Sequence, residues 1–465
     1  MNMINVRRLT VMTFLGAGML SGISAQVSPL QVDTLKETKI PDQWDLQSCI
    51  DYAKEQNITI RKNRITAVST QIDVKTAKAA LFPSLSFSTG HQVVNRPYQE
   101  TSSRVSGSEI ISSNSKTSYN GNYGLNASWT LYNGNKRLKT IQQEKLNNQM
   151  AELDVATSEN NIQESIAQVY IQILYAAESV KVNENTLQVS IAQRDRGQEL
   201  LNAGSIAKSD LAQLEAQVST DRYQLVTAQA TLEDYKLQLK QLLELDGENE
   251  MNIYLPALSD ENVLAPLPTK RDVYISALSF RPEIEASKLN VEASELGINI
   301  AKSSYFPTIS LSAGIGTNHT SGSDFTFGEQ VKNGWNNSIG LSVSVPIFNN
   351  RQTKSAVQKA KLQYETSMLS LLDEQKTLYK TIEGLWLDAN SAQQRYAAAN
   401  EKLKSTQISY ELISEQFNLG MKNTVELLTE KNNLLQAQQE QLQAKYMAIL
   451  NTQLLKFYQG DQLAL

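Results

Sequence analysis

Cysteine, histidine and long apolar runs are nearly absent from this chain of 465 residues. The single cysteine, Cys49, excludes an internal disulfide bond. Beyond the N-terminal region, no stretch approaches the roughly 18 consecutive apolar residues of a helix that crosses a membrane. The formal net charge of −5 provides no basic surface, so we exclude nucleic acid as a partner.

Catalytic and cofactor-binding motifs are missing too. The sequence holds no glycine-rich phosphate loop, no cluster of metal ligands and no setting that would activate a nucleophile. The two histidines, His91 and His319, are expected in solvated external loops, where they have no catalytic partner. We therefore expect neither an enzyme, nor a metal site, nor a bound cofactor.

Residues 1–25 predict a secretory signal peptide. Arg7 and Arg8 precede an apolar run at 9–20, and the stretch ends at Ala25 with the small residues of a cleavage site. An apolar core of about a dozen residues is too short to span a bilayer as a helix. Because Cys49 lies far beyond the cleavage site, a lipidated start is excluded as well. The chain is expected to be exported.

The mature sequence repeats itself over nearly its whole length. The segment 80–87 returns at 304–311, which is 224 positions later and again contains a Phe-Pro pair. Further along, 201–204 returns at 417–420, where the offset has become 216. A duplication on this scale constrains the architecture more than any single motif.

The two halves, 26–245 and 246–465, each predict the order helix, strand, loop, strand, long helix, tight turn, long helix. Proline breaks helix interiors, and none occurs between Pro97 and Pro256. The sequence therefore predicts one uninterrupted helix over 136–201, which at about 1.5 Å per residue is taller than most globular cores.

The helix that follows carries a heptad pattern. Apolar residues recur at every seventh position, with a companion seam between them, as in coiled-coil packing. The main seam is Leu211, Val218, Leu225, Leu232 and Leu239, and the companion seam is Leu214, Ala228, Tyr235 and Leu242. Such helices are expected to lie against neighbours along their whole length.

Four segments alternate between apolar and small polar residues, which predicts strands with one apolar face. They lie at about 83–93, 119–132, 307–317 and 337–348, with solvated loops at 92–118 and 318–337. Strands of this length and pattern are typical of outer-membrane barrel walls. A soluble sheet with one buried face is the alternative, but four such strands after a signal peptide, with no globular partner, favour the membrane.

Four strands cannot close a barrel, because about eight is the practical minimum. In lipid, an open sheet edge leaves backbone groups unpaired at a cost of several kcal/mol each, so edges must meet the edges of other copies. Two copies would give eight strands around a filled interior. Three copies would give twelve strands around an aqueous lumen.

These features together resemble the TolC-like outer membrane efflux protein family over about 44–458. Two features carry the resemblance: the Phe-Pro pair that opens a strand in each half, and the tip turns at about 201–210 and 417–426. The resemblance implies a mainly α fold with membrane β. A duplicated helix-strand-strand-helix-helix repeat would form a long coiled-coil α-helical tunnel and give four strands to a shared 12-stranded trimeric β-barrel.

The resemblance also implies a function. The chain would be a homotrimer channel subunit in the cell outer membrane, with its tunnel in the periplasm and 246–269 in an equatorial girdle. It would pass substrates from a periplasmic adaptor and an inner-membrane pump to the exterior, in efflux or type I secretion. The sequence does not identify the transported substrate, although the lack of clustered Met, His or Cys weighs slightly against copper or silver ions. The alternative is an exported coiled-coil scaffold or adhesin without a pore, which leaves the paired strands unexplained.

By position in the family, Gly204 and Gly420 lie in tip turns that contact the adaptor. A glycine at such a place also ends a helix in the left-handed conformation, and the two roles are compatible. Family members narrow the entrance with acidic rings on the second hairpin, and Glu426 falls at one such position. For Glu426 the alternative is a capping box with Asn423, and for Asp210 it is a carboxylate at a helix N-terminus.

Some family members lock the closed entrance with a tyrosine and an arginine on the second hairpin. This chain has Phe417 and Lys422 there, so one hydrogen-bond donor is lost and a planar guanidinium is replaced by a point charge. We hypothesise that Lys422 pairs with Asp210 across the closed entrance. Where some members have a second acid one turn after Glu426, this chain has Thr429, so any ring is expected to be single.

Overall fold

The computed structural model describes residues 40–98, 102–106, 109–113, 116–246, 251–256, 263–321 and 325–463. The expected signal peptide, and parts of the expected girdle segment 246–269, lie outside the described residues, and both stay predictions. The chain divides into two units, Met1–Ile40 and Pro41–Leu465. The fold described below is that of the second unit.

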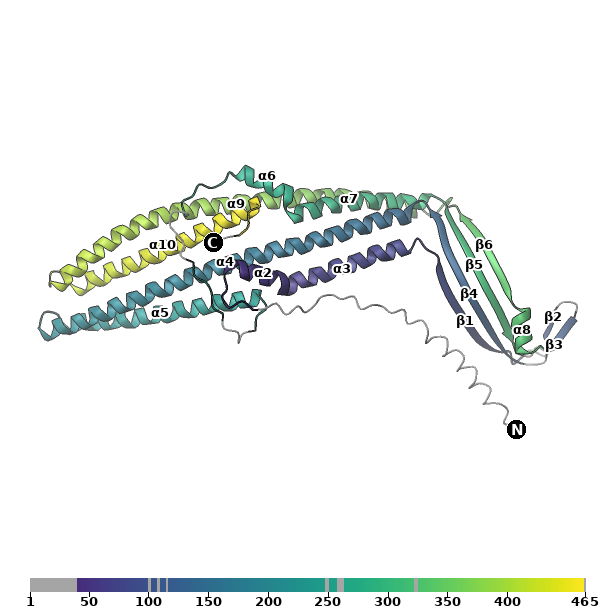
Figure 1. Cartoon of the computed structure of the whole chain (residues 1–465), viewed down its shortest axis with the longest axis horizontal. Helices are drawn as coiled ribbons and strands as arrows, with labels where there is room; N and C mark the ends of the chain where they lie inside the picture. The colour runs from purple at the N-terminus through teal and green to yellow at the C-terminus, as the bar shows by residue number, and fades with distance from the viewer. Residues whose placement is uncertain are drawn as a thin grey trace, which may run out of the picture. The chain divides into compact units, whose positions relative to one another are not determined.

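Each half contains two short helices, two long strands and two long helices, in the predicted order (Figure 1). The first half holds α2 (Leu46–Gln56), α3 (Ile58–Ala79), β1 (Ser84–Asn95), β4 (Thr117–Asn133), α4 (Lys136–Asn202) and α5 (Lys208–Leu242). The second holds α6 (Lys270–Phe280), α7 (Pro282–Lys302), β5 (Thr308–Thr320), β6 (Asn336–Ser344), α9 (Gln352–Asn418) and α10 (Thr424–Gln459). The predicted long helix over 136–201 is confirmed.

The single helix expected at the start of each half is broken in two. At the first break, Asn57 leaves the helical conformation with ψ 127°, and its side-chain oxygen accepts a hydrogen bond from the Thr59 amide at 2.9 Å. At the equivalent second break, Arg281 precedes Pro282, which occupies the first position of α7. A cap residue thus separates α2 from α3 in the first half, and a proline separates α6 from α7 in the second.

Both breaks pack against the end of the last helix in their own half. Asn57 donates its side-chain amide to the Leu242 carbonyl at 3.0 Å. The Arg281 guanidinium lies 4.0 Å from the centre of the Tyr458 ring. Leu242 and Tyr458 are separated by the same offset of 216 that relates the two tip turns. The duplication therefore extends to tertiary contacts.

Arg281 also anchors a buried charged cluster. Its side chain is 4% exposed, its Nε donates to Glu283 Oε1 at 2.7 Å, and its Nη2 lies 3.3 Å from Glu164 Oε1 on α4. The Tyr458 hydroxyl donates to Glu164 at 3.4 Å. Burial raises the pKa of Glu164, and the charge of Arg281 offsets part of that rise. The cluster joins α4, α7 and α10.

The four long strands form one antiparallel sheet in the order β1-β4-β5-β6. Residues that are in register across all four strands share their polarity, so that apolar rows alternate with rows of small or polar residues. One row is Leu85, Ala127, Ala313 and Ile339, and the next is Ser86, Asn126, Gly314 and Ser338. Because alternate residues of a strand point to opposite faces, one face of the sheet is apolar and the other polar. The predicted alternation is confirmed.

Some predicted strand and loop boundaries were wrong. β6 ends at Ser344 instead of 348, because Pro346 has no amide hydrogen for a sheet bond. His91 lies within β1 and His319 within β5, so neither histidine is a loop residue. In β1 and β5 the strand pairing continues past the point where the alternation of apolar and polar residues fades, so the sequence pattern does not mark where these strands end.

The two segments expected to be plain loops contain further structure. β2 (Ser102–Ser106) pairs with β3 (Glu109–Ser113), and α8 (Phe327–Asn333) follows β5. α8 begins with a capping box in which Thr326 and Glu329 exchange backbone-to-side-chain hydrogen bonds. The Thr-x-x-Glu pattern was readable in the sequence, but seven residues are too few to show helical periodicity.

The long helices pack in pairs, α4 along α5 and α9 along α10, and α4 also contacts α3 and α7 (Figure 1). The heptad seam of α5 is confirmed, since Leu211, Leu214, Val218 and Leu239 are buried. None of the helices within the described ranges is both long and apolar enough to cross a membrane.

We predict that Arg281→Met destabilises the protein by about 3–5 kcal/mol, because it leaves Glu164 buried without its partner. The matched control is Arg64→Met, which breaks a 2.8 Å pair with Glu159 that is largely exposed, and should cost less than about 1 kcal/mol. Thermal unfolding followed by circular dichroism measures both. Equal shifts for the two variants would contradict the assignment of Arg281 as a buried anchor.

Candidate functional site at the helix tips

Two tight turns end the hairpins of long helices. Gly204 (φ 76°) lies between α4 and α5, and Gly420 (φ 74°) lies between α9 and α10. The following residue closes each turn, with Ser205 N donating to Leu200 O at 2.8 Å and Met421 N to Gln416 O at 2.8 Å. No atom lies within 4 Å of a Cβ added at either glycine. Glycine is therefore required by the left-handed backbone and not by crowding.

The first tip is capped by Asp210. This residue is third in α5, and its carboxylate accepts a hydrogen bond from the Ala207 amide at 3.0 Å. Ala207 precedes the helix and has no polar side chain to complete a reciprocal capping box. The alternative considered from the sequence, a carboxylate at a helix N-terminus, describes its position.

Glu426 forms the capping box considered as its alternative role. Its carboxylate accepts from the Asn423 amide at 3.2 Å, while the Asn423 side chain accepts from the Glu426 amide at 2.9 Å. The Lys422 ammonium lies 2.5 Å from the other carboxylate oxygen of Glu426. The hydrogen bond from Lys422, with that from the Asn423 backbone, lowers the pKa of Glu426. A cap does not exclude a place in a charged ring, because the side chain stays partly exposed.

Within one chain, Lys422 therefore pairs with Glu426 and not with Asp210. Contact between Lys422 and Asp210 of different copies stays a prediction. Phe417 is only 3% exposed, so its side chain is buried within the single chain. In the isolated chain this side chain stabilises the tip instead of facing an opening.

A buried polar cluster ties the two hairpins together above the tips. The Lys431 ammonium on α10 binds both the Asp221 carboxylate on α5 and the Ser190 hydroxyl on α4. The Asp221 and Lys431 side chains are 1% and 3% exposed. Gln217 donates to the second oxygen of Asp221 at 2.9 Å, so both carboxylate oxygens are satisfied.

Burial lowers the pKa of Lys431, and the hydrogen bond and charge of Asp221 act against that shift. Two further hydrogen bonds join neighbouring helices at this level. Gln193 on α4 donates to the Tyr410 hydroxyl on α9 at 2.9 Å, and Ser409 on α9 donates to Glu430 on α10 at 2.9 Å. All four tip helices are thus linked by polar contacts.

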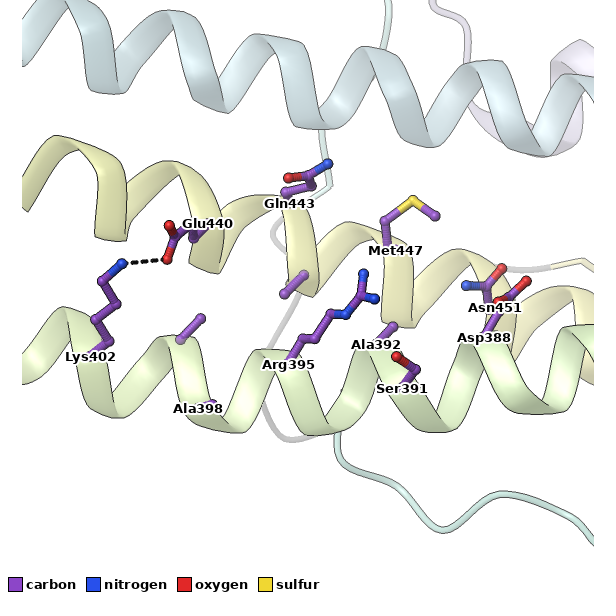
Figure 2. A pocket seen from close by; sticks show the side chains of 12 residues that line it. Asp388, Ser391, Ala392, Arg395, Ala398, Lys402, Glu440, Gln443, Met447 and Asn451 are labelled. Atoms are coloured by element: carbon purple, nitrogen blue, oxygen red, sulfur yellow. Dashed lines mark hydrogen bonds and ion pairs between the residues drawn. The ribbon is translucent and has the colours of Figure 1, made fainter.

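A surface groove runs between α9 and α10 above this level (Figure 2). Its small side chains include Ala392, Ala399 and Ala444. Figure 2 shows Arg395 reaching from α9 toward α10. Toward the tip, Lys402 forms a 2.7 Å ion pair with Glu440. Small residues with a charged rim can admit another helix.

A sequence model of the family described as outer membrane efflux protein matches residues 49–244 and 273–460. The chain belongs to this family. It is therefore a protein of the cell outer membrane, and the resemblance noted from the tip turns and Phe-Pro pairs is confirmed. The two matched segments correspond to the two halves of the duplication.

Two family relatives are each 24% identical to the chain over 294 residues: the outer membrane efflux protein BepC of Brucella suis and the outer membrane protein TolC of Escherichia coli. The alignments cover 63% and 61% of the chain. They span 61% and 58% of the relatives' own length, which is less than two thirds.

The fold is similar to that of the Campylobacter jejuni CmeC outer membrane channel, with a TM-score of 0.73 and 17% identity. The likeness covers 90% of this chain and 87% of the other. The predicted fold class, mainly α with four antiparallel strands in a duplicated plan, is confirmed.

The structure adds the Ser190–Asp221–Lys431 cluster, which sequence reasoning missed. The three residues are far apart in the sequence, and each lies on a different long helix. Asp221 lies three residues after Val218 on the heptad seam, and this was the one signal that a charge there would be buried. No group of three or more His, Cys, Asp or Glu side chains in the described parts is placed to hold a metal ion.

We predict that Lys431→Met alone destabilises this family member by about 3–5 kcal/mol, because Asp221 is left as an unpaired buried charge. The double variant Asp221→Leu/Lys431→Met should recover most of that loss, since apolar residues can replace a buried pair. Lys402→Met, in an exposed pair, is the control and should cost less than about 1 kcal/mol. Thermal unfolding measures all three. A double variant no more stable than the single one would contradict this reading.

Proposed function

We propose that the chain is one subunit of an outer-membrane channel that passes substrates from a periplasmic adaptor and an inner-membrane pump to the exterior. The system would be a tripartite efflux or type I secretion system, and the chain would not be an enzyme. The observation that carries this proposal is the exposed apolar face of the four-stranded sheet. On its edge strands, Leu85 is 70% exposed and Ile339 is 83% exposed. Water would leave such a face uncovered, whereas lipid would cover it.

The opposite face of the sheet suits a water-filled lumen. It carries serine, asparagine and glycine, and Ser84 and Ser128 share a 2.9 Å hydrogen bond between their hydroxyls. Small polar side chains leave space beside the sheet and offer hydrogen bonds to water. A sheet that is apolar outside and polar inside therefore supports the proposed channel.

Assembly into a homotrimer follows from the sheet edges. β1 and β6 are the end strands, and neither has a strand on its outer side among the described residues. In lipid those edges must pair with the edges of other copies. Three copies supply twelve strands, enough for a barrel with an open lumen, whereas two copies would supply eight and a filled interior.

Neighbouring copies would also cover apolar side chains along the helices. Leu362, Leu369 and Tyr379 of α9 are exposed in the single chain, as are Ile65 and Ile72 of α3. Exposed apolar residues spaced along helices of this length indicate a surface that another helix covers. Three copies would thus form the proposed α-helical tunnel below the barrel.

The tips are the proposed contact for the adaptor. Beside Gly420, the side chains of Leu419, Met421 and Val425 are exposed. Exposed apolar residues on a rigid turn suit a protein contact, and methionine adapts readily to a partner's surface. Gly204 would bring the first tip to the same partner, with the inner-membrane pump bound through the adaptor.

The proposal is tested by purifying the chain in detergent and reconstituting it in planar bilayers. We expect a heat-resistant trimer on gels without boiling, and conductance steps in the bilayer. The alternative, an exported scaffold or adhesin without a pore, predicts a monomer or dimer in buffer and no conductance. A water-soluble monomer would refute the channel.

Glu426 is proposed to form a cation-favouring ring of three carboxylates at the entrance. We predict that Glu426→Gln lowers cation preference, measured as the reversal potential in a salt gradient. Lys422→Ala should raise that preference at neutral pH, because it frees the carboxylate from its bound ammonium. Unchanged selectivity in Glu426→Gln would exclude the ring.

The same pair of residues predicts a pH dependence. Lys422 lowers the pKa of Glu426, so the carboxylate stays charged to lower pH than an ordinary glutamate. Removing Lys422 returns that pKa toward its usual value. As pH falls, cation preference should therefore disappear at a higher pH in Lys422→Ala than in the wild type. Identical pH profiles would show that Lys422 does not influence the ring.

A further inference from the structure

The only two histidines of the chain meet in the sheet, although they are 228 positions apart and belong to different halves. His91 on β1 is in register with Gly121 on β4, and Gly121 is in register with His319 on β5. All three residues therefore lie in one row on one face of the sheet. It is the same face that carries Leu85 and Ile339.

Both histidine rings lean over the glycine between them. A Cβ added at Gly121 would lie 2.6 Å from Nδ1 of His319 and 3.3 Å from Nδ1 of His91. One nitrogen of each ring thus lies close to the same position, where any residue other than glycine would place its Cβ. Gly121 itself is buried beneath the rings.

The two rings differ in their hydrogen bonds, since both nitrogens of His91 have a partner and Nδ1 of His319 has none. His91 Nε2 lies 3.1 Å from the Thr89 hydroxyl, and His91 Nδ1 lies 2.7 Å from the Tyr119 hydroxyl. If Nε2 donates to Thr89, Nδ1 accepts from the Tyr119 hydroxyl, and a metal ion bound at Nδ1 would take the place of that hydrogen bond. Nδ1 of His319 is buried and has no hydrogen-bond partner.

Aromatic rings lie beside this pair. Tyr119 lies 5.8 Å from His91 and 5.2 Å from His319, between ring centres. Tyr123 lies 5.4 Å from His91, and Phe327 of α8 lies 5.0 Å from His319. These rings restrict the rotation of both imidazoles.

We propose that His91 and His319 bind one transition-metal ion over Gly121. Two imidazole nitrogens without a nearby carboxylate favour borderline ions such as Zn²⁺ or Cu²⁺ over Ca²⁺ or Mg²⁺. The Tyr119 hydroxyl, or water, completes the coordination. The ion links β1 to β5 across β4, and so joins the two halves of the duplication at the end of the sheet remote from the long helices (Figure 1). This site is independent of the proposed channel function.

The test uses the full chain, purified in detergent without an affinity tag and titrated with Cu²⁺. Electron paramagnetic resonance should show one Cu²⁺ per chain with the hyperfine pattern of two imidazole nitrogens. His91→Ala and His319→Ala should each weaken binding by more than about tenfold, since even contacts behind a metal ligand are worth roughly 10- to 100-fold.

Two glycine variants distinguish Cu²⁺ binding at the histidine pair from Cu²⁺ binding elsewhere on the chain. Gly121→Ala keeps both histidines but places a methyl group at the converging nitrogens, and should abolish two-nitrogen binding. Gly90→Ala, a strand position with nothing within 4 Å of the added Cβ, is the matched control and should bind as the wild type does. A heat-resistant oligomer checks that each variant is assembled.

Two results would overturn the proposal. One is unchanged Cu²⁺ binding in the double variant His91→Ala/His319→Ala, which would mean adventitious binding elsewhere. The other is a spectrum with a single imidazole nitrogen in the wild type. Absence of conductance with two-nitrogen Cu²⁺ binding intact would count against the channel and leave the metal site standing.

Discussion

A four-stranded sheet with one apolar face and two unpaired edges cannot be stable as a single chain in water, and the remaining architecture follows from that constraint. Lipid satisfies the apolar face, but it cannot hydrogen-bond the edges of β1 and β6. The edges therefore require other copies of the same sheet. In the proposed assembly, the long helices hang from a shared ring of strands, and the apolar side chains that are exposed in the single chain are covered by other copies. The proposed channel would in this sense be a consequence of incomplete β-pairing.

Heptad seams bring helices together but do not set their register, because each apolar layer resembles the next. The buried charges supply that information. Arg281 can pair with Glu164 and Glu283 in one arrangement of the helices only. The same holds for Lys431 with Asp221 and Ser190. A helix shifted by one turn would bury these charges unpaired, at a cost of several kcal/mol. The two clusters thus hold the hairpins in place at the middle and near the tips.

The duplication preserved the backbone plan more closely than the chemistry. The two tip turns share the same left-handed glycine geometry, and the two helix breaks contact equivalent positions. Yet Asn57 became Arg281 in the second half, and the simple Asp210 cap became the Glu426 box with Lys422 beside it. The second hairpin consequently carries the paired charge at its tip.

The sequence alone determined the duplication, the strand alternation, the heptad seam and the glycine turns, because each depends on residues close together in the chain or at a constant offset. The helix break at Asn57 was missed, since a single cap residue is weak against a long helical pattern, and the break at Arg281 was missed although Pro282 follows it. The Ser190–Asp221–Lys431 cluster and the His91–Gly121–His319 row were decided only by tertiary structure. Their members are separated by tens to hundreds of positions, and no local periodicity records which of them will meet once helices and strands are packed.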